Sequence, residues 1–129
     1  MGLAPACAGG RSGVEIICRL REVSERLFSS LYDLKVTVDR IEGRSTCGLQ
    51  PGDYFELTDS SRVRIPDGKH FCVFALAAII PLLIAKERKL PAGDWLEQET
   101  FVACPDPEER LVMRIERVRR RRIPTGDLT

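Results

Sequence analysis

This chain has few of the residues from which enzymes most often build catalytic sites. Its 129 residues include one histidine and one tryptophan, and aromatic residues make up only 6% of the sequence. A single histidine excludes any site that needs two. The chain also has no Gly-rich phosphate loop, no HExxH, no GxSxG and no CxxC pair. No standard motif therefore assigns a reaction to it.

A long hydrophobic run and a secretion signal are missing as well. The apolar stretch at residues 71–85 is shorter than the ~20 residues of a spanning helix, and Pro81 interrupts it. Residues 1–12 are small and Gly-rich and have no charged leader followed by an apolar core, so we expect them to be disordered. We therefore predict a cytoplasmic protein that does not enter a membrane.

The net charge is only +1, so no global electrostatic field directs the protein to nucleic acid or to a membrane. The charges are nevertheless unevenly distributed. Residues 90–109 contain six acids and no base, whereas residues 114–122 contain six arginines and one glutamate. These segments suit either pairing with each other or binding of an acidic partner. No aromatic residue interleaves with the arginines, which argues against nucleic acid.

What is present indicates one globular domain with an N-terminal extension, because 129 residues suffice for one hydrophobic core. Residues 13–31 are predicted to form an amphipathic helix, since apolar residues recur at alternating spacings of four and three. Two roles for this helix stay open: it either packs on its own domain or pairs two subunits into a homo-oligomer through residues 14–31. Its apolar positions are Ile16, Leu20, Val23, Leu27 and Leu31.

Residues 32–118 are predicted to form a single α+β domain, in which a mainly antiparallel sheet packs on one apolar helix. Alternating patterns predict strands at 34–39, 53–58, 62–65, 100–104 and 111–118. The helix is predicted at 70–87, apolar on all sides and therefore buried on most faces, with a kink caused by Pro81. Residues 119–129 are predicted to be a frayed basic tail.

Three of the five cysteines are the main candidates for a functional site. Cys47, Cys72 and Cys104 each lie where a predicted element meets a turn, and such positions can converge in a fold. An odd cysteine count argues against a disulfide framework and favours free thiols in a reducing compartment. Thiolates bind zinc and other thiophilic metals, although ligands of structural zinc usually come in close pairs. Separate roles as small buried residues are the alternative.

Other residues could support such a site. Asp106 lies between Pro105 and Pro107, which fix the backbone around it, so it either faces a ligand or caps its own turn. His70 is close in sequence to Cys72 and would complete a Cys3His zinc set. Trp95 either lines a pocket or packs against its own domain.

Several short segments follow one another along the chain: Gly52-Asp53, Pro66-Asp67-Gly68, Phe71-Cys72, Ala75, Pro81, Ala103-Cys104-Pro105-Asp106 and Arg114-Ile115-Glu116-Arg117-Val118. Their order resembles a family of small uncharacterised prokaryotic proteins labelled "uncharacterized repeat protein", present here as a single copy over about residues 34–118. The resemblance implies that Cys47, Cys72 and Cys104 share one site, and it implies no reaction. His70 departs from the family, which has a small residue there, and residues 86–89 replace a Gly-rich stretch.

Three functional hypotheses follow. The first is a thiol-based site at Cys47, Cys72 and Cys104 that binds a metal or a small redox-active or electrophilic ligand. The second is a non-catalytic, self-associating module that binds an acidic partner through its arginines. The third is an enzyme with Cys72 or Cys104 as nucleophile and Asp106 as acid or base. The sequence does not identify the ligand.

Overall fold

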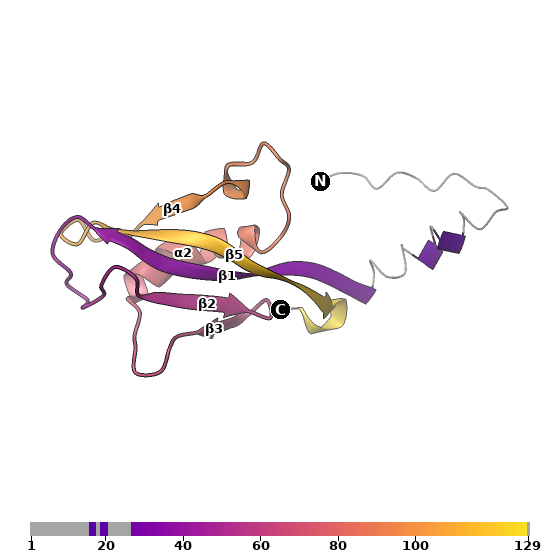
Figure 1. The fold of residues 1–129 in the computed structure, drawn as a ribbon, viewed down its shortest axis with the longest axis horizontal. Coiled ribbons are helices and arrows are strands. Elements are labelled where there is room, and N and C mark those ends of the chain that lie inside the picture. Colours follow the sequence, from indigo (N-terminus) through magenta and orange to yellow (C-terminus); the bar gives the residue numbers. More distant parts are fainter. Residues whose placement is uncertain (1–15, 18, 21–26, 129) are drawn as a thin grey trace.

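The protein folds as a five-stranded antiparallel sheet with one helix against it (Figure 1). The computed structural model describes residues 16–17, 19–20 and 27–128. The strand order is β3-β2-β1-β5-β4, and all neighbours are antiparallel. The α+β class and the antiparallel sheet are thus confirmed. The elements are β1 (Phe28–Ile41), β2 (Tyr54–Thr58), β3 (Arg62–Arg64), α2 (Val73–Lys86), the 3-10 helix η1 (Trp95–Glu97), β4 (Thr100–Ala103), β5 (Leu111–Pro124) and the 3-10 helix η2 (Thr125–Asp127).

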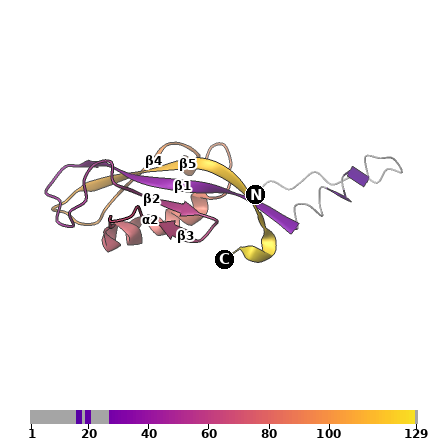
Figure 2. The ribbon, with the colours of Figure 1, turned by 60° about the horizontal axis from the view of Figure 1, so that its bottom comes forward.

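The core lies between α2 and one face of the sheet. Figure 2 shows α2 lying along that face. Helix α2 contributes Ala75, Ile79 and Leu83, whose spacing of four places them on one side of the helix. The sheet contributes alternate residues of its strands, because successive strand side chains point to opposite faces. Its buried positions include Val36, Val38, Phe55, Leu57, Leu111, Met113 and Ile115.

The two central strands, β1 and β5, pair along almost their whole length. Their register runs from Phe28 opposite Pro124 to Ile41 opposite Leu111, with a shift between Asp33 and Leu34. That irregularity explains why two consecutive residues, Asp33 and Leu34, are both buried where strict alternation would expose one.

Strand β1 begins earlier than the sequence pattern predicted. The predicted helix at 13–31 is wrong at its C-terminal end, because Phe28–Leu31 belong to β1 and pair with β5. Leu31, taken as the last apolar position of that helix, is a buried core residue. Residues 16–17 and 19–20 are helical, and most of the remaining helix lies outside the described residues. A partner strand far along the chain overrides a local helical pattern here.

The predicted basic tail at 119–129 is also wrong in its first part. Arg119–Arg122 belong to β5, which continues to Pro124. Asp33 of β1 explains this extension, because its buried carboxylate binds both Arg119 (3.2 Å) and Arg121. A carboxylate removed from water needs such partners. The predicted pairing of the acidic segment at 90–109 with the arginines is realised in part by a different pair, Arg117 with Glu97 (2.7 Å).

Helix α2 is less buried than its composition predicted. The side away from the sheet exposes apolar residues, among them Val73 (67%), Phe74 (63%) and Ile84 (60%). Pro81 lies inside the uninterrupted helix, and the kink expected there stays a prediction. Of the helices in the described ranges, none is long and apolar enough to span a membrane.

The C-terminal end of α2 holds two buried ionisable side chains. Lys86 donates three hydrogen bonds, to the carbonyl oxygens of Leu96 (2.6 Å) and Gln98 (2.7 Å) and to Thr100 Oγ1 (3.0 Å). It thereby fixes the connection between α2 and β4. Glu87 is only 5% exposed, and burial raises the pKa of its carboxyl from 4.5 to about 7.

The Glu87 carboxyl should make stability fall as the pH rises. Its folded-state pKa lies above the unfolded value, so its contribution is complete below about pH 4.5 and is lost as the pH rises through about 7. We expect Glu87→Gln to increase the free energy of unfolding by about 2–3 kcal/mol near pH 8 and to change it little near pH 4. Urea denaturation at both pH values measures this. An equal effect at both would contradict it.

Candidate functional site

Two segments leave the sheet side by side at the end of the central strands where β1 ends and β5 begins. Since Ile41 pairs with Leu111, the loop at 42–53 and the turn at 104–110 start as neighbours. Their backbones stay paired, with Gly43 N donating to Glu109 O (3.0 Å). A Cβ atom at Gly43 would lie 1.8 Å from the Glu108 carbonyl oxygen, so only glycine fits at this contact.

Glu109 holds the loop from the inside. Its side chain is fully buried, and its Oε2 accepts hydrogen bonds from the backbone N–H of Thr46 (2.9 Å) and of Cys47 (3.3 Å). The Cys47 thiol also donates to Oε2, with an Sγ–Oε2 distance of 3.1 Å. The loop that carries Cys47 is therefore fastened to a carboxyl group under it.

The other oxygen of this carboxyl group has no such partner. Glu109 Oε1 is buried, and no described residue forms a hydrogen bond with it. Leaving a buried acceptor without a partner costs about 1–3 kcal/mol, and more when it is charged. An ordered water or a bound ion would satisfy such an oxygen, and it lies in the side chain that already contacts the Cys47 thiol.

Cys47 and Cys104 lie near this carboxyl group, Cys72 lies near both of these cysteines, and all three are free thiols. Cys104 is a buried core residue, while Cys47 and Cys72 are half-buried and pack against the same core. Cys72 is the N-cap residue of α2, and its side chain does not cap the helix. Cys72 acts electrostatically on both other thiols, and so does Glu109. The loop, the helix start and the strand end thus bring their thiols into one neighbourhood.

The environment keeps two of these thiols protonated. Burial, followed by the hydrogen bond to Glu109, raises the pKa of Cys47 to about 11, and burial also raises the pKa of Cys104. The charged neighbours that act on both thiols are themselves acidic. Within the described ranges, no three His, Cys, Asp or Glu side chains are already arranged as ligands of one metal ion.

Asp106 and His70 support the loop from outside. Asp106 accepts a hydrogen bond from Thr46 Oγ1 (2.7 Å), which lowers the pKa of its carboxyl, and another from Glu108 N (2.9 Å) within its own turn. A ring nitrogen of His70 lies 2.7 Å from the backbone oxygen of Cys47. Both residues therefore position Cys47, and the turn-capping alternative for Asp106 is realised.

Trp95 lies at the other end of the molecule. It begins η1, next to the C-terminal end of α2, whereas Cys72 marks the N-terminal end. A helix of 14 residues separates these ends by about 20 Å. The side chain is 57% exposed, so Trp95 does not contribute to the cysteine neighbourhood.

Glu109 was not a candidate from the sequence, although it is the central residue of the site. It follows Glu108 in an acidic turn, a context typical of solvated carboxylates. Only the pairing of β1 with β5 covers it with the loop at 42–53. We find no signal in the sequence that distinguishes it from its exposed neighbour.

Comparisons with family models, with curated proteins and with solved structures found no match for this chain. The resemblance of residues 34–118 to the uncharacterised repeat proteins therefore stays a prediction from its motifs. The chemistry of the site has to be inferred from the contacts of its own residues.

We expect Glu109→Leu to lower the free energy of unfolding by about 2–4 kcal/mol, because two backbone N–H groups lose their acceptor. Chemical denaturation measures this effect. The adjacent Glu108→Leu is the matched control. It removes only an exposed ion pair with Arg44 and should change stability by less than about 1 kcal/mol. Equal losses in the two variants would contradict the role of Glu109.

Proposed function

We propose that Cys47, Cys72, Cys104 and Glu109 form a binding site for a thiophilic metal ion, for which Zn²⁺ is the reference. The observation that carries this proposal is the buried Glu109 Oε1, which has no partner among the described residues and belongs to the side chain that contacts the Cys47 thiol. A cation would satisfy this oxygen and deprotonated thiols together.

The donor set suits such an ion. Three thiolates and one carboxylate oxygen give four ligands, the number that Zn²⁺ takes in tetrahedral protein sites. Thiolates also discriminate against the hard cations Mg²⁺ and Ca²⁺, which prefer oxygen. Since the charged groups near the thiols are acidic, a bound cation would relieve the mutual repulsion of the ionised ligands.

Metal binding requires the side chains to move. In the structure the Cys47 thiol donates to Glu109 Oε2, so this hydrogen bond would be exchanged for two bonds to the metal. Cys47 lies in a loop, and a thiol there can turn without disturbing the sheet. The loop itself stays fixed, because the backbone N–H groups of Thr46 and Cys47 still donate to Glu109.

Catalysis by a cysteine nucleophile is less well supported. A nucleophilic thiol needs a lowered pKa, whereas burial raises the pKa of Cys47 and of Cys104. Asp106, the residue expected to act as acid or base, is occupied by Thr46 and by its own turn. A protonated resting thiol is compatible with a metal ligand, because the metal displaces the proton.

The alternative function, a self-associating module for an acidic partner, stays a prediction. Arg119 and Arg121 both bind Asp33, so these two arginines already have an acidic partner within the chain. Residues 28–31, the C-terminal part of the segment expected to pair two subunits, belong to strand β1 of the sheet. Neither observation favours this function over metal binding.

The test is metal titration of the reduced full-length protein, prepared without oxygen and with Cys7→Ser and Cys18→Ser. We expect one Zn²⁺ per chain by calorimetry, and a thiolate-to-metal charge-transfer absorption band when Co²⁺ replaces Zn²⁺. Each of Cys47→Ser, Cys72→Ser and Cys104→Ser should weaken binding by at least about tenfold, because each removes one ligand.

The chain with Cys7→Ser and Cys18→Ser is itself the control, and it should bind as tightly as the unaltered protein. Circular dichroism checks that every variant is folded. Failure of the folded protein to bind Zn²⁺, or unchanged binding when all three site cysteines are replaced, would overturn the proposal.

A further inference from the structure

A second site lies at the opposite end of α2 and is independent of the thiols. A cavity of about 240 Å³ separates the C-terminal half of α2 from the turn between β2 and β3. Its walls are mostly apolar and come from β1, β2, β3 and α2, and Leu128, which follows η2, also lines it. The apolar lining includes Leu31, Leu57, Val63, Ile80, Leu83 and Ile84.

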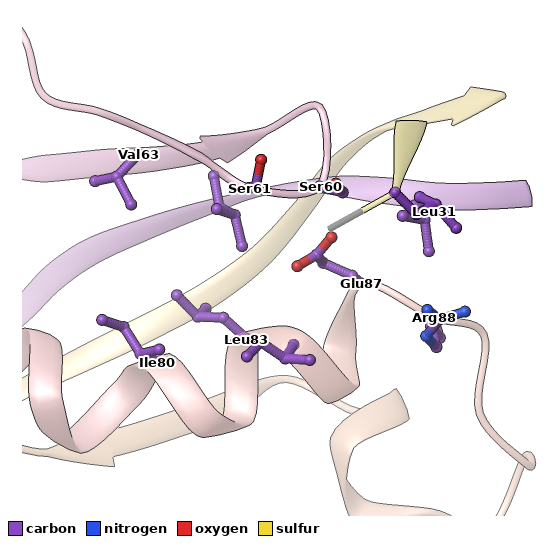
Figure 3. Close-up of a pocket in the computed structure, with 11 residues that line it drawn as sticks. Leu31, Ser60, Ser61, Val63, Ile80, Leu83, Glu87 and Arg88 are labelled. Atoms are coloured by element: carbon purple, nitrogen blue, oxygen red, sulfur yellow. The ribbon is translucent and has the colours of Figure 1, made fainter. Parts of the chain in front are cut away.

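Two polar side chains face this apolar space. Figure 3 shows the Glu87 carboxyl group directed from the end of α2 toward the turn that carries Ser60 and Ser61. Glu87 is 5% exposed and forms no side-chain hydrogen bond or ion pair with any residue that the structure describes. Ser60 Oγ is buried and likewise has no hydrogen-bond partner among those residues. Two convergent polar groups in an apolar cavity are the usual composition of a small-molecule site.

The charges around Glu87 leave its carboxylate uncompensated. Arg88, next to it at the cavity rim, is exposed and lowers its pKa, whereas Asp33 of β1 raises it. Arg119 and Arg121 of β5 do not neutralise the Glu87 carboxylate, because both bind Asp33. Asp59, at the turn between β2 and β3, also pairs with Arg121. Burial dominates, and the pKa of Glu87 is raised to about 7.

We propose that this cavity binds a small apolar molecule that carries a primary amine, with the ammonium group between Glu87 and Ser60 and the hydrocarbon part against α2 and β3. An ammonium group has three donors and no acceptor, so it satisfies both the carboxylate and the serine oxygen. It also supplies the positive charge that the buried carboxylate lacks. A carboxylic acid would add a second negative charge beside Glu87, and an alcohol would leave the carboxylate uncompensated.

The volume limits the size of the ligand. Pockets for drug-sized molecules span about 300–1,000 Å³, so a cavity of about 240 Å³ accepts a smaller molecule. Its apolar walls favour a hydrocarbon chain or ring over a sugar or a nucleotide. Hexylamine is a suitable probe, and hexanol and hexanoate are its neutral and anionic counterparts.

The experiment is a titration of the full-length protein with hexylamine, followed by amide chemical shifts in nuclear magnetic resonance. We expect shifts confined to the cavity lining, and a dissociation constant about tenfold lower near pH 8 than near pH 6, because the ionised fraction of Glu87 changes by about that factor. Hexanol and hexanoate should cause no comparable shifts.

Two variants and a control test the assignment. Glu87→Gln keeps the shape of the side chain and removes its charge, so it should weaken hexylamine binding at least about tenfold near pH 8. Val63→Lys adds a cation at a half-exposed position of the lining and should abolish binding. Glu99→Gln changes an exposed carboxylate elsewhere and should have no effect.

No cavity shifts with hexylamine would overturn the proposal, and so would equal binding of hexanol or of hexanoate. Unchanged binding by folded Glu87→Gln would overturn it as well. Because Cys72 and Glu87 lie at opposite ends of α2, these outcomes do not depend on whether the thiol site binds metal.

Discussion

The pairing of β1 with β5 is the constraint on which the rest of the structure depends. It joins residues that lie between 70 and 96 positions apart in the chain, from Phe28 opposite Pro124 to Ile41 opposite Leu111. From this end the loop at 42–53 and the turn at 104–110 leave together, so Glu109 is enclosed and reaches the Cys47 loop. At its other end the same ladder buries Asp33 between Arg119 and Arg121. One long-range pairing thereby organises both ends of the sheet.

Helix α2 divides the chemistry of the molecule between its two ends. Its first turn brings Cys72 to the thiol neighbourhood, and its last residues place Glu87 in the apolar cavity. Each end holds a buried carboxyl group beside a polar atom without a partner among the described residues: Oε1 of Glu109 itself at one end, and Ser60 Oγ near Glu87 at the other. Such groups are unfavourable for stability unless something binds them, which makes them more informative about function than the well-paired surface charges.

The local patterns predicted most of the sheet and the position of α2 because strand alternation and helix periodicity reflect burial directly. Phe55 and Leu57 share the buried face, as do Leu111, Met113 and Ile115. The patterns failed where a distant partner decided the outcome. Phe28–Leu31 follow a helical spacing but pair with β5. Arg119–Arg122 resemble a solvated tail but belong to β5, where Arg119 and Arg121 bind the buried Asp33. The positive charge of Lys86 suits the C-terminal end of a helix, where a solvated side chain is expected. In the structure this side chain is buried and donates hydrogen bonds to three acceptors in the segment that follows α2.

The sequence by itself determined the α+β class, the order of the strands and helix, and the positions of Cys72 and Cys104 at the ends of regular elements, whereas Cys47 lies in the middle of the loop between β1 and β2. These features depend on composition and on spacing along the chain, which are local properties. The tertiary structure alone decided that Glu109 is buried under the Cys47 loop while Glu108 is exposed, and that Glu87 faces a cavity while Arg88 lies at its rim. Adjacent charged residues look alike in sequence, and only the packing of distant segments determines which of them loses its water.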